Sequence, residues 1–329
     1  MQNSTIGIDL GFGDLKYYTV KNGDDPPKEI IGKFPTAIAL ARRGGIRGLD
    51  DSHRRYRYLD NEYLIGTDAL SSDKAMTIRD LDLLIDYAPL LVSRVFERLI
   101  TRNQLALNGD TALAVGLPLG EFFSKKQKLI TLLSDFEVSK RRRQISDIKV
   151  FAQGQGVFYD CLIKNDGRVN KAWWGKNLVV LDFGFNTLDI LCVKDGACCK
   201  ESSCMIYGAG ICRITRDLGD ELKLSGYDLS EPALKVTLVE KKVRQFGKTE
   251  KIGAIIDELT KEYAQYIFNE VYARVGDNIK NAEKIIIAGG GAYYVKNYFE
   301  EKYGKKFIYV SKQPEFSNAR GFYKFRTAK

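Results

Sequence analysis

Hydrophobic and polar residues alternate along several short segments of the chain, and turn-forming residues follow each segment. Residues 5–10 alternate in this way and are rich in β-branched side chains, which predicts a strand. A tight Gly-Phe-Gly turn follows, and residues 15–20 then predict the second strand of a hairpin. Residues 177–183 and 188–194 repeat the arrangement around the sequence Gly-Phe-Asn, so we expect an internal duplication.

Other segments have apolar residues at helical spacing, and they alternate with further strands. Helices are predicted at residues 89–107, 121–133, 157–164, 211–223, 230–245, 253–275 and 313–327. Further strands are predicted at residues 30–38, 111–117, 146–152, 200–207, 284–288 and 307–310. Asp195-Gly196 predicts a type I′ hairpin turn, and the Arg- and Gly-rich residues 41–58 predict a loop or a small irregular subdomain. This order predicts an α/β protein with helices on both faces of its sheets.

The length of 329 residues is sufficient for two domains. We expect a first domain at residues 1–170, with a small insert at about 31–75. A second domain is expected at residues 171–329, with a small insert at about 217–280. Hydrophobic residues make up 44% of the chain, yet no apolar run reaches the roughly 18 residues that span a bilayer. The N-terminal residues do not resemble a secretory signal, so we expect a cytoplasmic protein.

The cysteines and the single histidine bear on metal binding. None of the six cysteines belongs to a Cys-x-x-Cys motif, and the only histidine is His53. A structural zinc site is therefore not expected, and in a reducing cytoplasm the cysteines should be free thiols. The cysteines are Cys161, Cys192, Cys198, Cys199, Cys204 and Cys212.

The net charge of +9 favours an anionic partner, and two basic runs contribute much of this charge. They are Lys125, Lys126 and Lys128, followed by residues 140–143. We interpret both runs first as a solvated helix face and loop, with a DNA or membrane surface as the alternative. No helix-turn-helix, zinc-finger or RNP-type motif accompanies them, so direct sequence-specific DNA binding is not expected.

Candidate chemistry lies at the two predicted hairpins. Each has an Asp at the end of a strand, one apolar residue, a Gly, two more residues and a polar residue. The first turn contains Asp9, Gly11, Phe12, Gly13, Asp14 and Lys16. The second contains Asp182, Gly184, Phe185, Asn186 and Thr187.

A carboxylate at a strand end can hold Mg²⁺, usually through water. Glycine allows backbone N–H groups to approach phosphate oxygens, and Lys16 can add a point charge. One such turn alone is more often an ordinary β-turn. Two matching copies in a duplicated chain instead favour a phosphate clamp, which predicts binding of ATP with Mg²⁺.

These motifs also carry a family resemblance. The sequence resembles the superfamily of actin, heat-shock ATPases and sugar kinases, and within it the ParM-type plasmid-segregation actins and archaeal actin-like proteins. The matching segments are residues 9–16 and 182–189 (phosphate loops), 114–118 with 151–156 (first connecting segment), 208–210 (second connecting region) and 285–291 (adenosine motif).

The resemblance implies a duplicated actin-like, ribonuclease H-like fold in which two domains flank a nucleotide cleft. It implies metal-side carboxylates at Asp9 and Asp182 and a water-orienting side chain at Gln153. Asp189 can be a surface residue or part of the outer shell of the metal. Nucleotide contacts beyond the two turns are expected at Gly208, Gly210, Glu240, Lys241, Gly289, Gly290 and Gly291.

The implied function is a filament-forming ATPase that uses ATP or GTP with Mg²⁺ and hydrolyses it slowly. Its partners would be further copies of itself and a DNA-binding adaptor or other cargo, as in plasmid segregation. Two alternatives share the fold: a small-molecule kinase and a regulatory ATPase that does not polymerise. Gln153 argues against the kinase, because such enzymes need an acidic base near the γ-phosphate.

Overall fold

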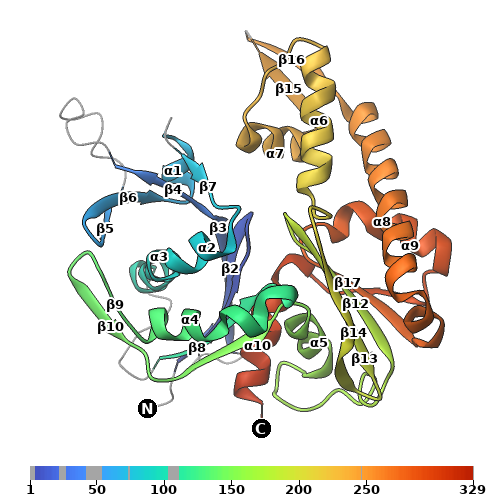
Figure 1. Cartoon of the computed structure of the whole chain (residues 1–329), viewed down its shortest axis with the longest axis horizontal. Helices are drawn as coiled ribbons and strands as arrows, with labels where there is room; N and C mark the ends of the chain where they lie inside the picture. Colours follow the sequence, from blue (N-terminus) through green and yellow to red (C-terminus); the bar gives the residue numbers. More distant parts are fainter. Residues whose placement is uncertain are drawn as a thin grey trace. The chain divides into compact units, whose positions relative to one another are not determined.

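A computed structural model describes residues 4–21, 27–41, 54–72, 75–102, 111–245 and 247–328 of the chain. The chain divides into two compact units (Figure 1). The first comprises Met1–Trp174 together with Phe316–Lys329, and the second comprises Gly175–Glu315. The expected second domain ran from residue 171 to residue 329. In the structure, its last segment belongs to the first unit.

A five-stranded sheet forms the centre of the first unit. Its strand order is β11-β8-β1-β2-β3. β1 pairs antiparallel with β2 and parallel with β8, and β11 pairs parallel with β8. These strands are β1 (Thr5–Leu10), β2 (Asp14–Lys21), β3 (Lys28–Pro35), β8 (Ala112–Leu117) and β11 (Ile148–Ala152).

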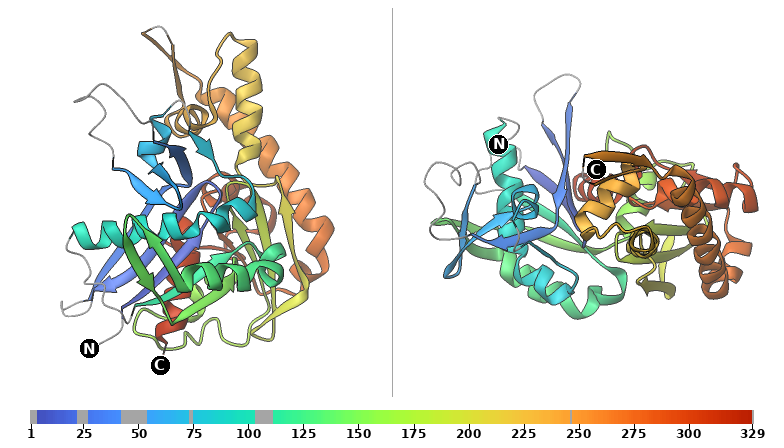
Figure 2. Two further views of the ribbon diagram at one scale, coloured as in Figure 1. Left: turned by 60° about the vertical axis from the view of Figure 1, so that its left-hand side comes forward. Right: turned by 90° about the horizontal axis from the view of Figure 1, so that it is seen from above.

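Helices cover both faces of this sheet, as the sequence predicted (Figures 1 and 2). One face packs against α3 (Ala88–Thr101) and α4 (Phe122–Ser134), and their side chains share a core with Ile6 and Ile8. The opposite face packs against α5 (Gln155–Leu162) and α10 (Ser317–Thr327), as Phe322 does against Ala114. Successive side chains of β1 point to opposite faces of the sheet, so alternate residues of β1 pack against two different layers of helices.

The C-terminal helix α10 lies unusually close to the backbone of its neighbours. A Cβ atom on Gly7 would lie 2.0 Å from the Ala319 carbonyl oxygen, and one on Gly321 would lie 1.7 Å from that of Gly156. Arg320 and Lys324 also reach the buried carboxylate of Asp160, at 2.6 and 2.9 Å. Glycine contacts and a buried ion-pair cluster thus fix α10 onto the sheet.

Two smaller pieces complete the first unit. A four-stranded sheet has the order β5-β6-β4-β7, and β9 and β10 form a separate hairpin. The bounds are β4 (Ala37–Leu40), β5 (Tyr56–Tyr58), β6 (Asn61–Ile65), β7 (Met76–Thr77), α1 (Thr67–Leu70), α2 (Leu81–Asp86), η1 (Leu119–Glu121), β9 (Asp135–Val138) and β10 (Arg141–Gln144).

Three segments of this unit can be compared with their predictions, and the first of these predictions is wrong. The single strand expected at 30–38 is two strands, β3 and β4. The break falls at Thr36, which does not pair with β2 and instead donates a hydrogen bond from its side chain to the Gly11 carbonyl oxygen in the first turn. The basic run at 140–143, interpreted together with residues 125–128 as a helix face and loop, lies at the turn of the β9–β10 hairpin and along β10. Within residues 41–58, expected to form a loop or a small irregular subdomain, Tyr56–Tyr58 form strand β5. Residues 42–53, with His53, and 103–107 of a predicted helix lie outside the described residues.

The second unit repeats the pairing pattern of the first sheet. Its strand order is β14-β13-β12-β17-β18, in which β12 pairs antiparallel with β13 and parallel with β17. β12, β13, β17 and β18 thus correspond to β1, β2, β8 and β11. The bounds are β12 (Leu178–Phe183), β13 (Thr187–Lys194), β14 (Ala197–Tyr207), β17 (Lys284–Ala288) and β18 (Ile308–Val310). The duplication read from the two hairpins is confirmed.

The helices α8 (Gly253–Asn281) and α9 (Ala292–Tyr303) share the core of the second unit with this sheet. The remaining elements are α6 (Cys212–Leu224), α7 (Glu231–Glu240), β15 (Lys242–Gln245), β16 (Lys248–Lys251) and η2 (Pro314–Phe316).

The predicted helix at 230–245 is wrong beyond Glu240. Lys241 has a left-handed φ of 53°, which ends the helix, and the chain continues into a hairpin. The predicted type I′ turn is confirmed, since Asp195 and Gly196 both have positive φ angles. Within the described ranges, the helices lack the combined length and apolar character that crossing a bilayer would require.

Candidate functional site

Asp9 is the centre of a polar cluster in the first unit. It is the penultimate residue of β1 and only 3% exposed. The hairpin register places it directly opposite Lys16, whose Nζ lies 3.2 Å from the Asp9 Oδ2 atom. A buried carboxylate is costly unless it is paired, and Lys16 provides that pairing.

Gln153 joins Asp9 from a part of the chain 144 residues away. Its Nε2 atom donates hydrogen bonds to Asp9 Oδ1, at 2.7 Å, and to the Leu10 carbonyl oxygen, at 3.4 Å. The meeting follows from topology, because β1, β8 and β11 are parallel and their carboxyl ends share one edge. An ionised carboxylate only accepts hydrogen bonds, so the amide must present its nitrogen to Asp9. The Oε1 atom is then the part of Gln153 that can accept a hydrogen bond from a water molecule.

The first turn is held from outside by residues that the sequence reading missed. The Thr36 Oγ1 atom donates to the Gly11 carbonyl oxygen at 2.6 Å, and Thr36 N donates to that of Gly13 at 3.0 Å. A Cβ atom on Gly11 would lie 2.6 Å from the Asp14 carbonyl oxygen, so the turn requires glycine there. Phe12 is buried beside it and closes the turn against the core.

The loop after Gln153 depends on the C-terminal helix. The side-chain oxygen of Asn318 in α10 accepts a hydrogen bond from Gly154 N at 3.0 Å. A Cβ atom on Gly156 would lie 2.6 Å from the Asn318 backbone. No local pattern in the sequence connects positions that are 164 residues apart, which is why Asn318 was not predicted.

Asp182 occupies the position in the second unit that Asp9 occupies in the first. It is the penultimate residue of β12 and 5% exposed. The residue opposite it is Asp189, where the first unit has Lys16. Asp189 is 1% exposed and accepts a hydrogen bond from Thr187 Oγ1 at 3.0 Å. Two buried carboxylates thus face each other across this hairpin, an arrangement that favours a cation.

The second turn is docked onto the start of helix α6. Gly208 N donates to the Asn186 carbonyl oxygen at 2.8 Å, and Cys212 N donates to that of Phe185 at 2.7 Å. A Cβ atom on Gly210 would lie 2.3 Å from the Phe185 carbonyl oxygen. The structure therefore brings together the predicted residues of segments 184–187 and 208–210.

The glycine run at 289–291 joins the same cluster. Gly289 has a φ of 78°, and a Cβ atom there would lie 2.3 Å from the Phe183 carbonyl oxygen and 2.7 Å from Asp182 Oδ1. Gly291 N donates to the same carbonyl at 3.0 Å, and helix α9 begins one residue later. Around Gly290 a Cβ atom would meet open space. A helix N-terminus beside a strand-end carboxylate is a common setting for phosphate and metal.

Helix α7 carries the predicted residues Glu240 and Lys241 at its end and a further residue, Lys235, beside the second turn. Glu240 and Lys241 lie at its end, where they pair with Arg244 at 3.4 Å and with Asp257 at 2.6 Å. Lys235, in the middle of the helix, lies 3.6 Å from the centre of the Phe185 ring in the second turn. The nucleotide contacts expected at Glu240 and Lys241 stay a prediction.

A buried tyrosine supports the segment at 208–210. The Tyr263 hydroxyl in α8 donates to the Ala209 carbonyl oxygen at 2.8 Å. Burial raises the pKa of Tyr263 far above its usual value, so this hydroxyl keeps its proton and remains a donor. Among the described residues, no three His, Cys, Asp or Glu side chains gather closely enough to hold a metal ion by themselves.

Two family models match the chain. Residues 7–156 match the N-terminal domain of actin-like proteins, and residues 180–301 match the C-terminal domain of the archaeal, MreB-like actin homologues. Together the two matches cover most of the chain. The curated proteins yield no match to this sequence.

Solved structures share the whole fold at low sequence identity. A ParM from a 15-stranded filament of Clostridium botulinum is 21% identical, with a TM-score of 0.71 and 99% coverage of both chains. The archaeal actin homologue Ta0583 in complex with ADP is 19% identical, with a TM-score of 0.76 and coverage of 98% and 99%. ParM of Bacillus thuringiensis with AMPPNP is 15% identical, with a TM-score of 0.71 and 98% coverage of both chains. The duplicated actin-like fold expected from the sequence is confirmed.

Proposed function

We propose that this chain, which belongs to the actin-like proteins, is an ATPase. Its assembly into filaments would depend on bound nucleotide. One observation carries the proposal. Asp9 and Asp182 occupy the same position in two sheets of the same topology, and each precedes a turn that contains glycine. Such turns bring backbone N–H groups close to phosphate oxygens, and the strand-end carboxylates suit a magnesium ion.

The side chains present fit a nucleotide with Mg²⁺. Mg²⁺ generally takes one or two carboxylates and completes its shell with phosphate oxygens and water. Asp182 faces the buried carboxylate of Asp189 across its hairpin, whereas Asp9 faces Lys16. We therefore propose that Asp182 contributes more than Asp9 to binding the metal ion, and that Lys16 contacts a phosphate group of the nucleotide. Gly289, Gly290 and Gly291 would line the adenosine side, and Lys235 would add a contact from α7 to those expected at Glu240 and Lys241.

Gln153 is assigned the positioning of a water molecule. The bound nucleotide would supply the phosphoryl group and Mg²⁺ its charge neutralisation. Gln153 itself is not a base, but Asp9 fixes its amide nitrogen and so directs Oε1. Orientation without proton abstraction is consistent with slow hydrolysis, as in GTPases that use a glutamine.

Self-association is the second part of the proposal. One structural relative forms a 15-stranded filament, and others contain ADP or AMPPNP. We propose that this chain likewise polymerises with ATP or GTP in the cytoplasm, and that hydrolysis destabilises the polymer. Cargo such as plasmid DNA would attach through a DNA-binding adaptor.

Sedimentation tests this proposal. The full chain is centrifuged after incubation with Mg²⁺ and ATP, ADP or a nonhydrolysable ATP analogue, alongside the Asp182→Ala variant. Asp195→Ala is the matched control, because it removes a carboxylate from the same sheet at an exposed turn. We expect nucleotide-dependent pelleting for the wild type and the control and none for Asp182→Ala. A wild-type protein that stays monomeric at high concentration with every nucleotide would refute the filament assignment.

A small-molecule kinase remains the alternative with the same fold. It is distinguished by ATP consumption that rises on addition of a hydroxylated or carboxylated acceptor. The glutamine at position 153 argues against it, because transfer to an acceptor hydroxyl needs a basic carboxylate. Acceptor-independent hydrolysis that increases with protein assembly would exclude the kinase.

A further inference from the structure

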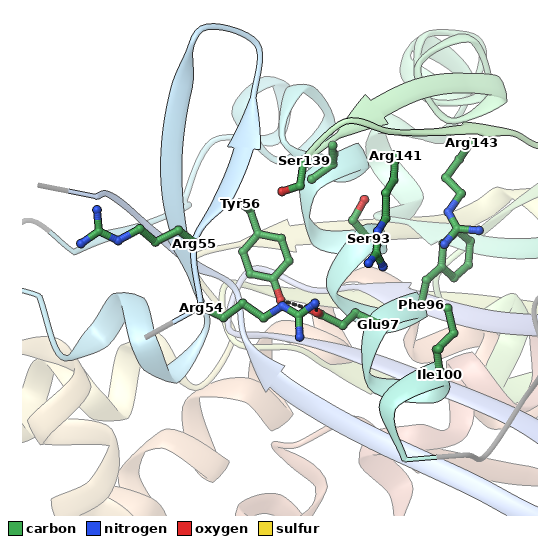
Figure 3. Close-up of a pocket in the computed structure, with 11 residues that line it drawn as sticks. Arg54, Arg55, Tyr56, Ser93, Phe96, Glu97, Ile100, Ser139, Arg141 and Arg143 are labelled. Atoms are coloured by element: carbon green, nitrogen blue, oxygen red, sulfur yellow. Dashed lines mark hydrogen bonds and ion pairs between the residues drawn. The ribbon is translucent and has the colours of Figure 1, made fainter. Parts of the chain in front are cut away.

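The first unit contains a cavity of about 170 Å³ that the proposed nucleotide site does not use. It lies between α3, the start of β5 and the β9–β10 hairpin, and arginines from two separate segments line it (Figure 3). Neither β1, which carries Asp9, nor β11, which ends just before Gln153, contributes to its lining. The cavity is therefore a separate feature of the first unit.

One side of the cavity is electrically balanced. Glu97 of α3 is 8% exposed, forms an ion pair with Arg54 and accepts a hydrogen bond from the Tyr56 hydroxyl. Arg94 donates to the same hydroxyl at 2.7 Å. These contacts fix Arg54 and Tyr56 in place. The negative charge of Glu97 is therefore balanced by the ion pair with Arg54 on this side of the cavity.

The other side carries positive charge. Arg141 and Arg143 are two residues apart on β10, so they project from the same face of the hairpin toward the cavity. Among the ion pairs of the described residues, none joins either guanidinium to a carboxylate. Arg143 stacks over the Phe96 ring at 5.4 Å, which orients its planar head group. Burial and the charge of Arg141 lower the pKa of Arg143, as expected for a cation without a local counter-charge.

Arg142, between them, provides the contrast. It projects from the opposite face and donates to both carboxylate oxygens of Asp135, at 2.8 and 2.5 Å. The three consecutive arginines therefore divide by strand alternation into one that is neutralised and two that line the cavity. A solvated basic loop would not show this division.

We propose that the cavity binds a phosphate group, held by Arg141 and Arg143. Guanidinium groups match phosphate oxygens through paired hydrogen bonds, and Phe96 with Ile100 offers an apolar wall beside them. The volume of about 170 Å³ is well below the roughly 300–1,000 Å³ of pockets for larger ligands. It suits a small phosphate ester or the phosphate head group of a lipid, and not a whole nucleotide.

Calorimetric titration with phenyl phosphate tests the site in the full chain. Excess Mg²⁺ and ADP are present throughout, so that a nucleotide site, if the chain has one, is already filled. The test variant is Arg141→Gln with Arg143→Gln, and Arg142→Gln is the matched control from the same strand. We expect the double variant to bind at least about tenfold more weakly, since charge-assisted hydrogen bonds are lost, and the control to bind as the wild type does.

A flotation assay identifies the source of the phosphate. Vesicles of phosphatidylcholine alone are compared with vesicles of equal parts phosphatidylcholine and phosphatidic acid. Binding to the acidic vesicles that the double variant loses and the control keeps supports the site with a lipid as its ligand. Binding of phenyl phosphate alone, with the same dependence, supports the site with a soluble ester.

Three results would overturn the proposal. The wild type binds neither probe, the double variant binds like the wild type, or Arg142→Gln weakens binding as much as the double variant does. The last result would show a general effect of charge. Because Arg141 is exposed, Arg141→Gln alone provides a variant that should fold, and it should still weaken binding severalfold.

Discussion

Replacing Gly321 with alanine tests how tightly the C-terminal helix is seated on the first unit. In an open helix this substitution stabilises the protein by about 0.5–1 kcal/mol, because alanine restricts the unfolded chain. In α10 the new Cβ atom would lie 1.7 Å from the Gly156 carbonyl oxygen and 2.8 Å from Asp160 N. A carbon and a carbonyl oxygen approach to roughly 3.3 Å, so the helix must move by about 1.5 Å.

That movement would break the bonds that hold the helix. Arg320 reaches Asp160 at 2.6–2.7 Å and Asn318 reaches Gly154 at 3.0 Å, so both contacts would exceed hydrogen-bond length. Overpacking costs about 1–3 kcal/mol, and separating a buried ion pair costs about 3–5 kcal/mol. The net expectation is a loss of about 3 kcal/mol, or a fall in melting temperature of roughly 6–12 °C for a unit of this size.

Thermal unfolding followed by circular dichroism measures the effect. Gly276→Ala in α8 is the control, since its Cβ atom would come no closer than 3.4 Å to the Tyr272 ring. We expect the control to be neutral or slightly stabilising. A Gly321→Ala protein as stable as the wild type would refute the close seating of α10.

Three further predictions follow from single contacts. Gln153→Ala should lower the rate of phosphate release from ATP by about tenfold or more while changing nucleotide affinity less, because orientation of water is lost; equal losses in both would contradict a positioning role. Tyr263→Phe should lower the free energy of unfolding in urea by about 1–2 kcal/mol, since the buried Ala209 carbonyl oxygen loses its donor, and an unchanged midpoint would disprove this. Burial raises the pKa of Cys192 to about 12, so at pH 8 only on the order of one thiol in ten thousand is ionised. Mass spectrometry should find Cys192 unmodified by iodoacetamide in the native protein and modified in urea, whereas rapid native labelling would contradict its burial.

Local sequence patterns were sufficient for the duplicated sheet. The alternation of residues 5–10 and 177–183 and the turn residues after them express strand and hairpin geometry directly. The same patterns were sufficient to propose Asp9 and Asp182, because a strand end followed by glycine is a local feature. The resemblance to actin-like proteins supplied the distant member, Gln153.

Contacts between residues far apart in the sequence could not be predicted from local patterns. Asn318 and Thr36 support the two ends of the Asp9 cluster through contacts with residues far along the chain. The end of α7 was missed because the residue that adopts the left-handed conformation there is a lysine, and not the glycine or asparagine that usually marks a helix end. The β9–β10 hairpin was missed for a related reason: its turn contains Ser139 with positive φ and lacks the usual glycine.

In the function proposed above, the strand-end carboxylates of Asp9 and Asp182 hold a nucleotide with its metal. Equilibrium titration of ATP with and without Mg²⁺, in the wild type and in the Asp9→Asn and Asp182→Asn variants, tests this claim most directly. We expect Mg²⁺ to tighten ATP binding to the wild type, and Asp182→Asn to remove most of that gain, weakening binding at least about tenfold. Asp9→Asn should weaken binding less, because Lys16 would lose its partner but remain available to phosphate. A wild type that does not bind ATP, or variants whose affinity and Mg²⁺ dependence equal those of the wild type, would contradict the account.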